Sequence, residues 1–181
     1  SDINLLSEAG YIFYHSILLI DHIIDEKDFS NISQLIYLQE ESIKILTSVF
    51  GRKSLFWDLW IDRRNEYFEA VKIEKSINIK GQCDFKTYSK LADKKSAFGK
   101  IAIDSLWLLS KKLDRKMYKK LIKSHQYFSV GLQLYDDFRD FSEDLRINQF
   151  NWGVFILKNE IDFTDYQNNH NTIHKLFYLR G

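Results

Sequence analysis

The sequence predicts an all-α fold, a helical bundle, and three observations support this prediction. The chain has no proline and seven glycines, whereas sheet proteins with many tight turns need more of both. Apolar residues recur at helical spacing over long segments. The polar connections between these segments are short, which is typical of neighbouring helices in a bundle.

The first half of the chain predicts three helices, each with a broad apolar stripe. We expect them at residues 3–27, 31–50 and 54–78. Ser30 is the expected N-cap of the second helix, and Gly51 is expected to close that helix in a C-cap position. Gly81 is expected to end the region of the third helix.

The second half predicts three more helices, at residues 85–112, 115–146 and 149–160. Asp84 and Asp114 stand directly before the first two and are expected to cap them, because a carboxylate accepts hydrogen bonds from the free N–H groups of a first turn. Residues 162–172 are rich in asparagine and predict a loop, with a possible last helical turn at residues 173–179.

Length and charge exclude several classes of function. The 181 residues fit a single domain, which could be truncated at one or both ends. A net charge of +1 gives no general attraction for nucleic acid. The lone Cys83 excludes a disulfide framework and fits a reducing, cytoplasmic compartment. The longest apolar stretch, residues 11–20, is about half of the roughly 20 residues that a membrane span needs, so we expect no span.

An unusual row of carboxylates follows an apolar run in the fifth expected helix. Its members are Asp136, Asp137, Asp140, Glu143 and Asp144. On a continuous helix positions 136, 140 and 144 lie one turn apart, and like charges at that spacing cost about 0.2–0.5 kcal/mol per pair. A solvated acidic face is one interpretation. The other is an inward face that binds Mg²⁺, since the ligands would all be oxygen atoms.

A second acidic pair, Asp21 and Asp25, ends the first expected helix at a spacing of four residues. Two such helices facing each other would hold metal ions at the rim of an apolar cavity. Because Mg²⁺ prefers a few carboxylates plus phosphate oxygens, the implied ligand is phosphorylated.

A basic segment lies between the two acidic ones. Lys90 and Lys94 share a helical face, with Lys95 and Ser96 beside it. These side chains either contact phosphate or form an exposed lysine face. For Lys100, further along, we expect an exposed surface position.

Three stretches, taken together and in this order, resemble one protein family. They are FYHSILLIDHIIDE at 13–26, LADKKSAFGKIA at 91–102 and GLQLYDDFRD at 131–140. The sequence resembles the class I isoprenoid synthases, which comprise the trans-prenyl diphosphate synthases and the terpene cyclases. The first and third stretches resemble the two aspartate-rich motifs of that family, and the second resembles its lysine motif.

The resemblance implies an all-α bundle around a central apolar cavity, a homodimer, and an enzyme that ionises an allylic prenyl diphosphate with Mg²⁺. The implied metal ligands are Asp21, Asp25, Asp136, Asp137, Asp140 and Asp144. The implied catalytic residues are Asp21, Asp25, Asp136, Asp137 and Lys95. The implied substrate-binding residues are Lys90, Lys94, Lys95, Ser96, Gln133, Phe13, Ser16 and Ile17. The aromatic candidates for carbocation stabilisation are Phe13, Tyr14, Phe98, Phe128 and Tyr135.

Two departures from the family pattern leave the reaction open. The second aspartate of the first motif is His22 here, and the arginine pair that comes after that motif in chain-elongating members is missing. Condensation with isopentenyl diphosphate and cyclisation of a single substrate both remain open. A non-catalytic subunit that binds a prenyl diphosphate is the alternative from another class, and a helical adaptor with solvated acidic faces is a third.

Overall fold

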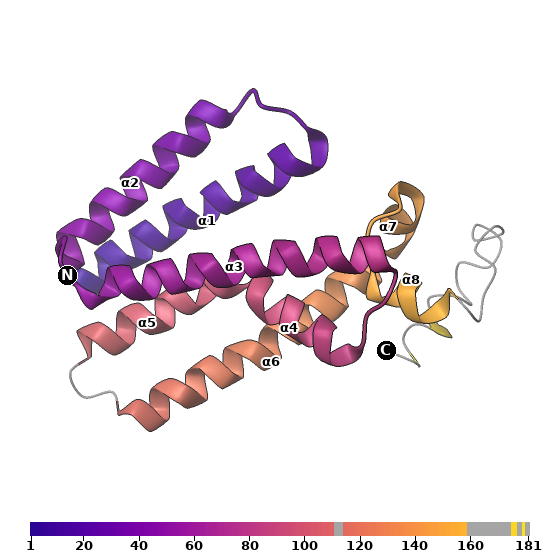
Figure 1. The fold of residues 1–181 in the computed structure, drawn as a ribbon. Coiled ribbons are helices and arrows are strands. Elements are labelled where there is room, and N and C mark those ends of the chain that lie inside the picture. The colour runs from indigo at the N-terminus through magenta and orange to yellow at the C-terminus, as the bar shows by residue number, and fades with distance from the viewer. Residues whose placement is uncertain (111–113, 159–174, 177–178, 180–181) are drawn as a thin grey trace. The chain divides into compact units, whose positions relative to one another are not determined.

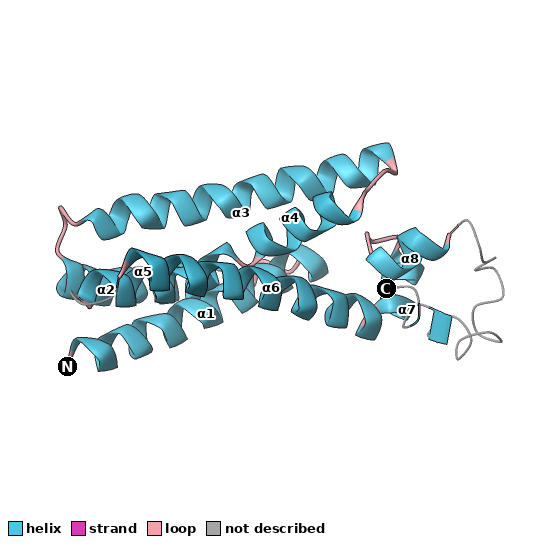
Figure 2. Ribbon diagram, turned by 90° about the horizontal axis from the view of Figure 1, so that it is seen from below, coloured by secondary structure: helices cyan, strands magenta, loops and turns pink. Residues whose placement is uncertain are grey.

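The computed structural model describes residues 1–110, 114–158, 175, 176 and 179, and within these it leaves out the side chains of Asp21, Ile24 and Asp25. All regular secondary structure in this part of the chain is helical (Figure 2). The predicted all-α class is therefore confirmed for the residues described.

Eight α-helices and one short 3₁₀ helix, η1, make up the described structure (Figure 1). Their bounds are α1 Asp2–Glu26, α2 Ile32–Phe50, α3 Leu55–Lys80, α4 Phe85–Lys95, η1 Ala97–Gly99, α5 Lys100–Leu109, α6 Arg115–Arg139, α7 Phe141–Ile147 and α8 Trp152–Leu157. The chain divides into two compact units, which are described separately. Unit 1 holds Ser1–Asp62 with Ile101–Lys112, and unit 2 holds Arg63–Lys100 with Leu113–Gly181.

Four of the five residues predicted to cap or end a helix are confirmed. The carboxylates of Asp84 and Asp114 each accept a hydrogen bond of 2.7 Å from the backbone N–H three residues later. Gly51 and Gly81 follow α2 and α3 with φ of 72° and 61°, a left-handed region that favours glycine. The predicted Ser30 cap is wrong. Asn31 precedes α2, and Ser30 instead donates to the carboxylate of Asp28 through its N–H and its hydroxyl.

Two expected long helices are each broken once. The segment 85–112 is α4, η1 and α5, and the break falls at Ser96, whose hydroxyl donates to the carbonyl oxygens of Ala92 and Asp93. Such local hydrogen bonds compete with a regular helix. The segment 115–146 breaks at Asp140, where φ is −93° and ψ is 6°. The expected loop at 162–172 lies outside the described residues, as does most of the turn at 173–179.

In unit 1, α1 and α2 pack side by side as a helical hairpin (Figure 1). Ala9 is fully buried, and the Ser42 hydroxyl donates a 3.0 Å hydrogen bond to its carbonyl oxygen. Small side chains at this contact let the two backbones approach closely. By length and composition alone, Asp2–Ile20 of α1 is apolar enough to cross a membrane, although the sequence led us to expect no span.

Unit 2 has its own hydrophobic core, built around four buried side chains. They are Tyr88, Phe141, Trp152 and Leu157. The Tyr88 and Trp152 rings stack with centroids 4.9 Å apart, which joins α4 to the start of α8. Helix α4 also packs against α6. The acidic stretch at the end of α6 therefore lies against this core.

The same substitution is expected to have opposite effects at two glycines. Gly10→Ala, within α1 and with open space around the glycine, should raise the free energy of unfolding by about 0.5–1 kcal/mol because alanine favours the helix. Gly81→Ala should lower it by about 1–2 kcal/mol because of the left-handed φ. Urea unfolding of both variants checks this, and changes of the same sign would contradict the described backbone.

Candidate functional site

The second acidic stretch spans the end of α6 and the start of α7, and its carboxylates have different environments. Asp137 is buried, with 4% of its surface exposed. The side chains of Asp136 and Asp140 are 39% and 40% exposed. The prediction that positions 136, 140 and 144 share one continuous helix is wrong, because α6 ends before Asp140 and Asp144 belongs to α7.

The Asp137 carboxylate accepts three hydrogen bonds. Its Oδ2 accepts one of 3.0 Å from the Tyr88 hydroxyl and one of 2.9 Å from the Trp152 backbone N–H. Its Oδ1 accepts one of 2.9 Å from Gln133 Nε2. These donors come from α4, α8 and α6 itself. Asp137 therefore holds three helices together.

Asn151 continues this arrangement on the backbone side. Its Nδ2 donates to the Asp137 carbonyl oxygen at 2.6 Å and to Asp144 Oδ2 at 2.8 Å. Its Oδ1 accepts from the Val154 N–H and so caps α8. The carboxylate of Asp144 is thus already hydrogen-bonded within the protein.

Burial is the largest influence on the pKa values of Asp137, Tyr88 and Asp144. It raises the pKa of Asp137, against the hydrogen bonds from Gln133, Trp152 and Tyr88 and the positive charge of Lys95, which lower it. Burial and the neighbouring Asp137 raise the pKa of Tyr88, so the phenol stays a hydrogen-bond donor. Burial also raises the pKa of Asp144, against the hydrogen bond from Asn151.

Arg139 neutralises much of the charge in the exposed part of the row. Its Nε and Nη2 lie 2.9 Å and 3.1 Å from the two carboxylate oxygens of Asp140, and Nη2 lies 3.9 Å from Asp136 Oδ1. Arg146 lies 3.6 Å from Glu143. Repulsion along the exposed part of the row is therefore relieved by the two arginines.

The expected phosphate-binding lysines have partners on α3, with one exception. Lys94 pairs with Glu69 and Lys95 with Glu74, each at 2.7 Å. The Ser96 hydroxyl contacts the Ser129 hydroxyl on α6. Lys90 is exposed, as the lysine-face interpretation expected.

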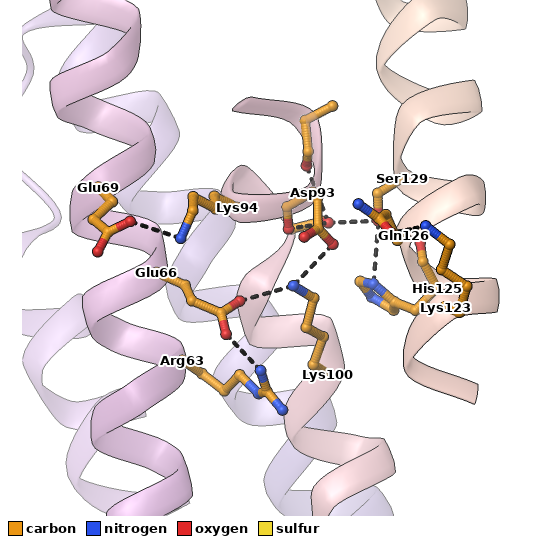
Figure 3. A network of polar contacts seen from close by, with 12 residues as sticks. Arg63, Glu66, Glu69, Asp93, Lys94, Lys100, Lys123, His125, Gln126 and Ser129 are labelled. Carbon is orange, nitrogen blue, oxygen red and sulfur yellow. Dashed lines mark hydrogen bonds and ion pairs between the residues drawn. The ribbon is translucent and has the colours of Figure 1, made fainter. Parts of the chain in front are cut away.

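The expectation of an exposed Lys100 is wrong, since only 3% of its side chain is exposed. Its Nζ lies 2.8 Å from both Glu66 Oε2 and Asp93 Oδ1, and Glu66 in turn binds Arg63 at 2.6 Å (Figure 3). Asp93 Oδ1 accepts no hydrogen bond of standard geometry from the residues described, so its attraction to Lys100 is electrostatic. The carboxylates compensate the cost of burying this ammonium group.

His125 on α6 borders this ion network, and its Nδ1 lies 3.2 Å from the Ser129 hydroxyl (Figure 3). Burial lowers the pKa of His125, and the charges of Lys100 and Arg63 lower it further, while Asp93 and Glu66 oppose them. The imidazole is therefore expected to be neutral near pH 7.

The first acidic motif lies on α1 in unit 1. Asp21 and Asp25 are helical, and their side chains lie outside the part of the chain that the structure describes. Phe13 packs on Trp60 with ring centroids 4.9 Å apart, and Ser16 is fully buried, donating to the Phe13 carbonyl oxygen. Ile17 is half-buried.

Of the aromatic candidates for carbocation stabilisation, three are largely exposed. Tyr14, Phe128 and Tyr135 have 59%, 67% and 60% of their surface accessible. Phe98 packs near Tyr67. An enclosed aromatic pocket is therefore not formed by these residues within either unit.

The donor chemistry of the acidic stretch fits Mg²⁺ in part. Asp136 and Asp140 offer half-exposed carboxylate oxygens, which are the hard ligands that this ion prefers. Asp137 is committed to three hydrogen bonds. Among the described side chains there is no preformed group of three acidic, histidine or cysteine residues that could hold a metal.

A pocket of about 530 Å³ lies where α3 ends and α4 begins, away from the acidic stretch in sequence. Its lining residues are Ile73, Ser76, Ile77, Lys80, Gln82, Cys83, Asp84 and Thr87. Burial and the charge of Asp84 raise the pKa of Cys83 to about 11, so the thiol is protonated at neutral pH. None of the expected site residues lines this pocket.

The partners that give the acidic stretch its shape were not expected from the sequence. Tyr88 and Asp137 are 49 positions apart, and Lys100 and Glu66 are 34 apart. No periodicity connects residues at such separations. Asn151 accepts a hydrogen bond from the Val154 N–H and caps α8.

No family model, no curated protein and no solved structure matches this chain.

Replacing Asp137 by asparagine is expected to lower the free energy of unfolding by about 2 kcal/mol, because an amide cannot accept from all three donors and leaves a buried one unsatisfied. Asp136→Asn, at a half-exposed position, should change it by less than about 0.5 kcal/mol. Urea unfolding of the two variants checks this. Equal effects would contradict the structural role of Asp137.

The contribution of His125 to the stability of the protein should be lost as the pH drops from about 7.5 to about 5. Its folded-state pKa is lowered, so its contribution is present above the unfolded-state pKa and is lost as the pH falls through the folded-state value. In His125→Gln the decline should be shallower. Urea midpoints at several pH values for both proteins measure this, and parallel curves would refute it.

Proposed function

We propose that this chain is a Mg²⁺-dependent class I isoprenoid synthase that ionises an allylic prenyl diphosphate. The observation that carries the proposal is that the aspartates of the second acidic motif have different environments. Asp137 is fixed inside unit 2 by Tyr88 and Trp152, while Asp136 and Asp140 keep carboxylate oxygens at the surface. A rigid scaffold with accessible oxygen ligands suits a metal–diphosphate site.

Asp136 and Asp140 would hold the metal together with phosphate oxygens, and Asp144 would join them if its hydrogen bond to Asn151 opened. Bound Mg²⁺ would supply electrostatic stabilisation of the departing diphosphate. On the basis of the family resemblance, Asp21 and Asp25 of the first motif would be further metal ligands. Arg139, which binds Asp140 and lies near Asp136, would have to move away or turn toward the diphosphate.

The lysines would bring positive charge to the diphosphate end of the substrate. Lys90 is exposed and able to reach a phosphate, and Lys94 and Lys95 would exchange Glu69 and Glu74 for phosphate oxygens. Lys95 also acts electrostatically on Asp137, which indicates that it lies near the motif. Ser96, Gln133, Phe13, Ser16 and Ile17 would complete substrate binding, on the basis of the resemblance.

The isoprenoid-synthase type of bundle with a central apolar cavity, a homodimer and a cytoplasmic location all belong to this proposal. The proposal covers two possible reactions of the ionised substrate, condensation with isopentenyl diphosphate and cyclisation. His22 and the missing arginine pair weigh against condensation.

A non-catalytic subunit that binds prenyl diphosphates is the second candidate. Two contacts favour it. The carboxylate of Asp140 accepts a hydrogen bond from Arg139, and the carboxylate of Asp144 accepts one from Asn151. Each contact would have to open before those carboxylates bound a metal.

Diphosphate release from geranyl, farnesyl and geranylgeranyl diphosphates tests the enzymatic proposal. We expect release that requires Mg²⁺ and that falls at least about 100-fold in Asp136→Asn/Asp140→Asn, since the lost ligands stabilise the leaving group. Glu143→Gln, an exposed acidic position of the same stretch, is the matched control and should keep its activity. Assays with and without isopentenyl diphosphate separate condensation from cyclisation.

Absence of release from the folded wild-type protein under every condition would refute the enzymatic proposal. A rise in melting temperature with Mg²⁺ and a prenyl diphosphate, without release, would support the binding subunit, since a ligand specific for the folded state stabilises it. No shift and no release would contradict both.

A further inference from the structure

The first half of α6 carries a stripe of basic side chains outside the candidate site (α6 is marked in Figure 1). The basic stripe consists of Arg115, Lys116, Lys119, Lys120 and Lys123. All five residues are exposed. Because they recur at spacings of four residues, they lie along one side of the helix. They line a shallow depression of about 430 Å³.

The charge of the stripe is not compensated within the part of unit 2 that the structure describes. Arg115, Lys116, Lys119 and Lys120 make no ion pair with a described carboxylate. Lys123 donates to Gln126 and lies over the Tyr127 ring, 4.7 Å from its centroid. The chain as a whole has a net charge of +1, so the stripe is a local concentration of positive charge. Like charges at this spacing destabilise the isolated helix, and an anionic partner would remove that cost.

Exposed apolar side chains lie beside the stripe on the same helix. Met117 and Leu121 each directly follow a basic residue of the stripe, which places them about 100° further round the helix. They are 47% and 37% exposed, and Tyr127 and Phe128 are each 67% exposed. A helix with a basic face and an adjoining exposed apolar face is typical of segments that lie in a membrane interface.

We propose that this face of α6 docks on the surface of a bilayer that contains anionic phospholipids. Clusters of four to eight basic residues on an amphipathic helix are attracted to such surfaces. The long lysine side chains can reach the headgroups while Met117 and Leu121 enter the acyl boundary. A nucleic acid would match the charge but would leave these apolar side chains in water. The basic stripe, Met117 and Leu121 share no residue with the candidate diphosphate site.

Co-sedimentation with vesicles tests the proposal. The full chain is mixed with vesicles of phosphatidylcholine alone or with about one third phosphatidylserine, at low and at high salt. We expect binding to the anionic vesicles only, and its loss at about 0.5 M salt because charges at the surface are screened. Lys119→Gln/Lys120→Gln should weaken binding about 25-fold, since each basic residue near such a surface contributes about a fivefold gain in affinity.

The matched control is Lys72→Gln/Lys75→Gln, which removes the same charge from exposed positions of α3 in the same unit. This control should bind as the wild type does. Met117→Ser/Leu121→Ser should also weaken binding with no change of charge, and Lys119→Arg/Lys120→Arg should preserve it. Far-UV circular dichroism verifies that each variant is folded.

Three outcomes would overturn the proposal. If the α3 control weakened binding by the same factor, binding would depend on the net charge of the protein and not on the basic stripe. Equal binding to neutral vesicles would point to apolar insertion elsewhere in the chain. Tighter binding to a 20-nucleotide RNA or DNA than to the anionic vesicles, at the same salt concentration, would favour a nucleic acid as the partner.

Discussion

The buried carboxylate of Asp137 is the contact on which the organisation of unit 2 depends. It accepts hydrogen bonds from Tyr88 on α4, from Gln133 on α6 and from the first N–H of α8 at Trp152. Burying a carboxylate is costly unless its oxygens are hydrogen-bonded. Three donors meet this requirement, and in doing so they fix the positions of α4 and α8 on α6. The stacked rings of Tyr88 and Trp152 then close the core around the same point.

The members of the acidic row have different tasks, so the row is neither a uniformly solvated face nor a ready set of equivalent ligands. Asp137 supports the fold, Asp144 binds Asn151, and Asp136 and Asp140 share Arg139 at the surface. A metal–diphosphate ligand would therefore meet two accessible carboxylates held on a rigid base. The proposed synthase and the proposed binding subunit both start from that arrangement. They differ in whether the bound diphosphate is then released from its prenyl group.

Positively charged side chains have two contrasting environments within unit 2. Lys100 is buried and is compensated by Glu66 and Asp93. The basic stripe of α6 is exposed and has no described carboxylate within ion-pair distance. Because Lys100 is buried, this network can fix α3 and α4 relative to the start of α5. The stripe remains available to an anionic surface, and this availability is the basis of the proposed membrane docking.

The helical class and four of the five predicted capping or terminating residues could be predicted from the sequence alone. These features depend on local physics: apolar periodicity, the capping carboxylates of Asp84 and Asp114, and glycine at left-handed φ. The burial of Lys100 and the structural role of Asp137 depend instead on tertiary contacts. Lys100 needs Glu66, 34 positions away, and Asp137 needs Tyr88, 49 positions away. The free energy of burying a charge is set by such distant partners, and no local pattern in the sequence encodes them.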